Sequence, residues 1–270
     1  MISPTRIRAV AGACLLLGLP AVTQATMTLP FGDIFLNGTL DFHYAADGSA
    51  RIDPVLYVDS NETFGPGALA TVFAPPDTVT GATGLDYTYS VTGVGTDALE
   101  MTYAIGNQTG LTWTGLRFFV DVSGDPFDDL LEIPIIEVGS TDSSDPAGWG
   151  VDDFLGGDLF LTDILNAAKL DGENHCAGAA CAAEGGLEWD LDALPSGKTW
   201  LISVRLSDDG STLGNVALRM QLADGVGAAL DGQLLSVSGR AVVVPLPGAL
   251  LLMLAALPTL VARNRASRRA

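Results

Sequence analysis

Carboxylates gathered in one loop are the side chains whose type and spacing could do chemistry in this chain. Asp121, Asp125, Asp128 and Asp129 follow an apolar stretch that has the pattern of a strand. Calcium takes six to eight oxygen ligands, which carboxylates and carbonyls of one loop can supply together. The spacing is not that of an EF-hand. Two interpretations stay open, a solvated acidic loop, which is the commoner case, and a calcium site. Apart from this calcium ion, the sequence indicates no cofactor.

Residues for nucleophilic or hydrolytic catalysis are scarce. The chain has two histidines, His43 and His175, and it lacks a Gly-x-Ser-x-Gly elbow, a His-Glu-x-x-His motif and a glycine-rich phosphate loop. His43 alternates with apolar neighbours and is expected to be an ordinary strand residue, while His175 is expected at the surface of a loop. A glycan hydrolase stays open as an alternative, because glycoside hydrolysis needs only two carboxylates. No pair of carboxylates stands out, so we favour a non-enzymatic protein.

The cysteines predict a disulfide. Cys14 lies in an apolar N-terminal segment, which leaves Cys176 and Cys181 as the pair in the remainder of the chain. An even number of cysteines in an exported chain indicates a bridge, which here would close a small loop. Metal binding together with the neighbouring His175 would need further ligands at suitable spacing, and none is adjacent, so we favour the disulfide.

Strands must position these residues, because alternation of apolar and polar side chains is frequent and helical patterns are scarce. With short strands and Gly, Asp or Asn turns, the sequence predicts an all-β antiparallel β-sandwich, jelly-roll-like, of about eight to eleven strands. Two smaller sandwiches are the alternative. The predicted strands lie at 33–44, 86–91, 98–105, 115–122, 131–138, 200–207, 216–222 and 233–244.

The N-terminus has the features of a secretory signal peptide over residues 1–25. Arg6 and Arg8 precede the apolar run Ala9–Leu19, and small residues lead up to a cleavage site after Ala25. The apolar run is too short to be a membrane span. We therefore expect an exported domain that begins at residue 26 and ends at residue 241.

Residues 242–270 form three successive parts. A short motif, Val244-Pro245-Leu246-Pro247, comes before the apolar run Ala249–Ala262, and four arginines follow it. Arginines directly after an apolar helix favour the cytoplasmic side, which places the bulk of the chain outside. Residues 248–262 would span about 22 Å as a helix, so a full span would also need residues 242–247.

This tripartite end resembles the PEP-CTERM sorting signals of Gram-negative bacteria, in the variant whose motif reads Val-Pro-Leu-Pro. The resemblance covers only about Val242–Ala270. It implies that an exosortase, a membrane transpeptidase, acts near the motif, together with the secretion machinery. It also implies transient residence in the inner membrane through the C-terminal helix, followed by release to the cell surface or extracellular matrix. A simple tail anchor is the alternative.

A hairpin over Tyr103–Val120 resembles one that is common in exported PEP-CTERM proteins. Asn107 and Gly110 are expected to make its turn, and Trp113 to cover the open end of the core. Leu194–Leu201 similarly resembles a turn and strand found near the end of such domains. Both segments are markers of a fold, and neither carries chemistry.

The charge of the exported part is strongly negative. Six of the 13 basic residues lie in the two terminal segments, whereas all 32 acidic residues lie between them, which leaves seven against 32 and a net charge of −25. Such a surface repels phosphate backbones, so nucleic acid is excluded as a partner. The resemblance implies a cell-surface or matrix protein associated with exopolysaccharide and biofilm. A carbohydrate-binding module is the alternative, if Trp113, Trp149 or Trp189 stand exposed together.

Overall fold

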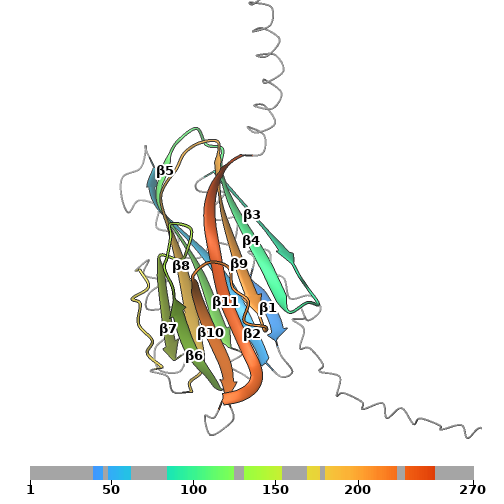
Figure 1. The fold of residues 1–270 in the computed structure, drawn as a ribbon. Coiled ribbons are helices and arrows are strands. Elements are labelled where there is room, and N and C mark those ends of the chain that lie inside the picture. Colours follow the sequence, from blue (N-terminus) through green and yellow to red (C-terminus); the bar gives the residue numbers. More distant parts are fainter. Residues whose placement is uncertain are drawn as a thin grey trace, which may run out of the picture.

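The computed structural model describes residues 39–44, 48–61, 84–124, 131–153, 169–176, 180–223 and 229–246. Every helix or strand assigned within these ranges is a strand, and the strands form two antiparallel sheets (Figure 1). The all-β prediction is therefore confirmed. Ala25, with the rest of the predicted signal peptide, and Pro247 with the residues after it lie outside the described ranges. Within those ranges, no helix has the length and hydropathy that a membrane span requires.

Eleven strands occur in the described part of the chain. The five-stranded sheet contains, in spatial order, β1 (Leu40–Tyr44), β2 (Gly48–Asn61), β5 (Trp113–Gly124), β8 (Ala183–Leu194) and β7 (Gly148–Asp153). The six-stranded sheet contains β3 (Leu85–Thr92), β4 (Ala98–Asn107), β9 (Lys198–Ser207), β11 (Ala229–Pro245), β10 (Val216–Ala223) and β6 (Leu131–Val138).

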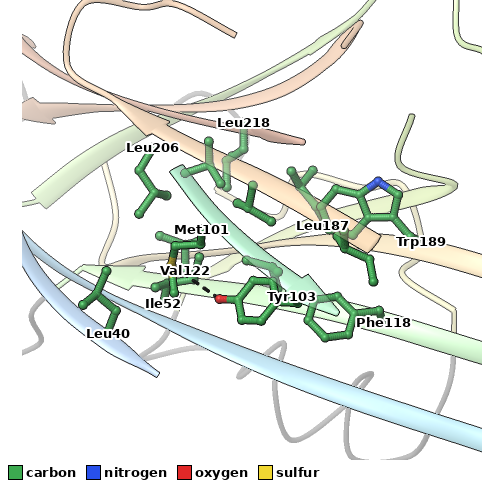
Figure 2. Packing of buried hydrophobic residues seen from close by; sticks show 14 of the residues in the cluster. Leu40, Ile52, Met101, Tyr103, Phe118, Val122, Leu187, Trp189, Leu206 and Leu218 are labelled. Atoms are coloured by element: carbon green, nitrogen blue, oxygen red, sulfur yellow. Dashed lines mark hydrogen bonds between the residues drawn. The ribbon is translucent and has the colours of Figure 1, made fainter. Parts of the chain in front are cut away.

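One core lies between the two sheets. Alternate residues of the strands point inward, and those of both sheets join a single cluster of buried side chains (Figure 2). At its centre the ring of Phe118 lies 4.9 Å from that of Tyr103 and 6.5 Å from that of Trp200, measured between centroids. The Tyr103 hydroxyl donates a hydrogen bond to the sulfur of Met101. Because one cluster draws on both sheets, the described strands form one sandwich.

Two glycines allow close packing across this core. A Cβ atom at Gly185 would lie 2.2 Å from a methyl group of Leu218, which belongs to the opposite sheet. A Cβ atom at Gly239 would lie 2.6 Å from the carbonyl oxygen of Ser203 and 2.8 Å from the ring of Trp189. Gly239 therefore requires a residue without a side chain, because the close atom belongs to the backbone, whereas a side chain at Gly185 would require the buried Leu218 to move.

The turn between β4 and β5 joins strands of different sheets and is held by a buried asparagine. The hairpin predicted over Tyr103–Val120 is therefore wrong, because β4 pairs with β3 and β9 whereas β5 pairs with β2 and β8. The Asn107 side-chain amide donates to the carbonyls of Leu111 and Leu194, and its oxygen accepts hydrogen bonds from Thr109. The Trp113 indole nitrogen donates to the Thr109 hydroxyl at 3.2 Å, and the tryptophan is buried. Asn107 and Trp113 thus stabilise the turn and close this end of the core.

The last strand includes part of the predicted sorting motif. Val244 and Pro245 pair with β9, and the backbone nitrogen of Leu246 donates to the carbonyl of Gly197 at 3.0 Å. The predicted boundary between residues 241 and 242 therefore falls inside β11. The described end of the folded domain is Leu246.

Candidate functional site

Of the four aspartates of the predicted calcium loop, Asp121 alone lies within the described residues. Asp121 lies on β5 opposite Gly186 of β8, and its side chain is buried. Asp125, Asp128 and Asp129 lie outside the described residues. The calcium site therefore stays a prediction.

Two aspartates of the loop between β6 and β7 have structural roles. Asp145 is buried and accepts hydrogen bonds from the backbone of Asp142 and from the backbone and side chain of Asn215. Burial would raise the pKa of Asp145, but these hydrogen bonds outweigh it and lower the pKa. Asp142 accepts hydrogen bonds from the backbone and hydroxyl of Ser144, and it forms an ion pair with Arg240. Protein donors thus already occupy both carboxylates.

A cleft of about 1000 Å³ opens beside this loop, between the edges of β8 and β11. The loop ties the two sheets together, since Ala147 donates to the carbonyl of Glu188 on β8 and Ala241 of β11 donates to the carbonyl of Ser144. The walls combine aromatic rings with carboxylates and small aliphatic side chains. Among the lining residues are Trp149, Trp189, Trp200, Asp142, Asp190 and Asp192.

The tryptophans do not gather on one exposed face. Trp113 and Trp189 are 2% and 1% exposed, so neither offers a free ring to a ligand. Trp149 of β7 is half-buried and packs against the core with part of its surface in the cleft. The indole nitrogen of Trp189 is buried and has no hydrogen-bond partner among the described residues. Of the three tryptophans considered in the sequence, Trp149 alone could stack on a ligand.

Glu188 and Asp190 form a carboxyl pair on the outer face of β8. Glu188 is completely buried and accepts a hydrogen bond from the backbone nitrogen of Leu170 at 2.9 Å. Asp190 forms an ion pair with Lys169. Burial, and then the neighbouring Asp190, raise the pKa of Glu188 to about 7. Because Glu188 is buried, it cannot reach a substrate as a catalytic acid.

Glu188→Gln is expected to remove part of the pH dependence of stability. The pKa of Glu188 in the folded protein, about 7, lies above its ordinary value of 4.5. The folded state therefore holds an extra proton between these values, and stability falls as the pH rises through this window. The glutamine keeps the acceptor for Leu170 and mimics the protonated carboxyl. We expect a gain of about 1–2 kcal/mol in unfolding free energy at pH 8 and little change at pH 4.

Urea denaturation at the two pH values measures this effect. Glu137→Gln is the control, because that carboxylate is 53% exposed on its side chain and pairs with Arg219 at the surface. Equal pH profiles in both variants would contradict the assignment to Glu188.

His175 lies among carboxylates whose proximity to it the sequence did not indicate. Its Nδ1 atom lies 3.0 Å from Asp152 Oδ1, and its Nε2 atom lies 3.2 Å from Glu173 Oε2 and 3.6 Å from Asp171 Oδ2. Burial would lower the pKa of His175, but these carboxylates, Asp152 foremost, outweigh it and raise the pKa. The alternating spacing of Asp171, Glu173 and His175 was visible in the sequence. The contact between His175 and Asp152 of β7 was not visible there. His43 lies on β1, paired with Ser49.

Cys176 and Cys181 are joined by a disulfide, with Cα atoms 6.0 Å apart. Both cysteines are buried. Cys181 exchanges two backbone hydrogen bonds with Glu132, and the backbone nitrogen of Cys176 donates to the side chain of Asn174. The bridge therefore holds the segment that carries His175 next to the sheets.

Thiol labelling of the native protein without reductant is expected to modify neither Cys176 nor Cys181. Reduction should lower the unfolding free energy by about 2 kcal/mol, because the closed loop is short. Labelling after unfolding in reductant serves as the control and should modify both residues. Labelling of both cysteines in the native, unreduced protein would contradict the bridge.

The sequence matches no protein-family model, no curated protein and no solved structure.

Proposed function

We propose that this chain is an exported, non-enzymatic protein of the cell surface or extracellular matrix of a Gram-negative bacterium, associated with exopolysaccharide. The observation that carries the proposal is the order of motif, apolar run and arginines over residues 242–270. A signal peptide over residues 1–25 supplies the route out of the cytoplasm. The disulfide between Cys176 and Cys181 is compatible with an oxidising compartment, and the negative charge favours solubility.

In this proposal an exosortase and the secretion machinery are the partners, and the C-terminal helix holds the protein in the inner membrane until processing. The position of Leu246 at the end of the six-stranded sheet adds a constraint. A processing enzyme needs an extended, accessible chain, and residues 242–245 are hydrogen-bonded in β11. The cut is therefore expected beyond Leu246.

Intact-mass spectrometry of the native protein tests the proposal. The expected mass lacks residues 1–25 and the arginine tail after Ala262. Recovery of the protein in the inner membrane with residues 263–270 still attached would contradict exosortase processing and favour a simple tail anchor.

The proposed fold within the all-β class is jelly-roll-like. β4 pairs with β9 in one sheet, and β5 pairs with β8 in the other. The chain passes from β4 to β5 and later returns from β8 to β9, so a two-stranded ribbon crosses from one sheet to the other. This wrapped ribbon is what supports a jelly-roll-like fold.

Binding of an extracellular polysaccharide in the cleft is a second candidate function. Trp149 offers part of an aromatic face, and the exposed carboxylate of Asp192 could accept hydrogen bonds from sugar hydroxyls. A polysaccharide pull-down, with and without calcium, tests this candidate. Trp149→Ala should abolish binding, while Ile135→Ala, an exposed aliphatic position outside the cleft, should not. Retained binding in Trp149→Ala would exclude the cleft, and release of soluble sugar would instead favour a glycan hydrolase.

A further inference from the structure

The segment from Asp171 to His175 bends at Gly172, whose φ is +74°, and is hydrogen-bonded along β7. Gly172 donates to the carbonyl of Trp149 at 2.9 Å, Val151 donates to the carbonyl of Glu173 at 3.0 Å, and His175 donates to the carbonyl of Val151 at 2.9 Å. These backbone hydrogen bonds hold the segment that carries Asp171, Glu173 and His175 beside β7.

The polar atoms of these three side chains converge. One atom from each lies within 4.8 Å of the other two. His175 Nε2 is 3.2 Å from Glu173 Oε2 and 3.6 Å from Asp171 Oδ2. Ligand atoms about 2.0–2.2 Å from one tetrahedral ion are separated by about 3.3–3.6 Å. Small side-chain movements would therefore bring all three atoms onto a single ion.

The imidazole is oriented from outside this group. Asp152, on β7, is 8% exposed, and its carboxylate lies 3.0 Å from His175 Nδ1. A carboxylate that accepts the Nδ1 proton fixes the tautomer in which Nε2 carries the free lone pair, and metal-binding histidines usually have such a partner. The disulfide at Cys176 ends the segment and restrains it further.

We infer that Asp171, Glu173 and His175 bind a divalent transition-metal ion, for which zinc is the probe. An imidazole nitrogen favours zinc, cobalt or nickel over calcium and magnesium, which prefer an all-oxygen site. Three protein ligands leave a position for water. The acidic surface raises the local concentration of cations. This site is separate from the predicted calcium loop at Asp121, and it does not depend on the proposed export or on polysaccharide binding.

Zinc binding to the full chain in detergent tests the inference. The disulfide is kept oxidised, any free thiol is blocked, and bound metal is first removed with a chelator. Competition with a chromogenic zinc indicator should give one equivalent of zinc per chain. His175→Ala should weaken binding at least about 30-fold, and Asp152→Asn, which alters only the partner of Nδ1, about 10-fold. Cobalt should give the visible absorption bands of a tetrahedral site, and His175→Ala should abolish them.

Glu137→Gln is the control for diffuse charge, because it removes one surface carboxylate that lies on β6, away from the proposed ligands. It should leave zinc affinity within about twofold, and circular dichroism should show that every variant is folded. Two results would overturn the site. One is the absence of stoichiometric zinc, with His175 remaining an imidazolium ion paired to its carboxylates. The other is an equal loss of affinity in His175→Ala and Glu137→Gln, which would show that zinc is held by diffuse charge.

Discussion

Phe118→Ala is expected to lower the unfolding free energy by about 3–5 kcal/mol, the largest effect of any single truncation proposed here. Phe118 is completely buried, and its ring lies between those of Tyr103 and Trp200. These neighbours belong to the opposite sheet, so the truncation leaves a cavity where the two sheets meet. Both the lost transfer free energy and the cavity contribute to the cost.

Equilibrium unfolding in urea measures this loss. Val94→Ala is the control, because Val94 is 52% exposed in a turn and its truncation should change stability by less than about 0.5 kcal/mol. A loss below about 1 kcal/mol in Phe118→Ala would mean that the sheets do not enclose this side chain.

Gly239→Ala is expected to destabilise the fold by about 1–3 kcal/mol although it adds a single methyl group. That group would lie 2.6 Å from the carbonyl oxygen of Ser203 and 2.8 Å from the ring of Trp189. The oxygen belongs to the backbone of β9, so relief requires β11 to shift. Trp189→Phe in the same chain should restore little stability, because it removes only the contact with the ring.

Gly106→Ala is the matched control in the same sheet. Its added methyl group would lie 3.4 Å from side-chain atoms of Asp86 and Leu246, which is ordinary contact. Thermal unfolding of the two variants separates close packing from a general effect of glycine replacement. Equal melting temperatures would contradict the close approach of β11 and β9 at Gly239.

The strands that the sequence predicted are those with regular alternation. β6 has the same bounds as predicted, and β4, β9 and β10 lie within a few residues of their predicted positions. β2, β7 and β8 were missed. In β8, Gly185 and Gly186 stand where a turn would be usual. The reason for Gly185 is the side chain of Leu218 from the other sheet, which no local pattern can reveal.

The candidate sites were predicted less completely than the strands. The pairing of Cys176 with Cys181 follows from composition, and the structure joins the two residues. The surroundings of His175 could not be derived, because Asp152 is distant in sequence and reaches it only through the pairing of β7 with the segment before the disulfide. Whether Trp189 is exposed depends likewise on β11, which covers it.

The course of β11 has a mechanical consequence. This strand runs through the six-stranded sheet between β9 and β10, and its ladder with β9 continues from Ser236 to Pro245 (Figure 1). Tension applied to the chain beyond Leu246 in line with the strand acts parallel to its own axis. The hydrogen bonds to β9 are then loaded in shear, and many must break together, whereas a hairpin pulled from its open end unzips one pair at a time. A tether at the C-terminal end would therefore pull on the sandwich in a direction in which it resists rupture.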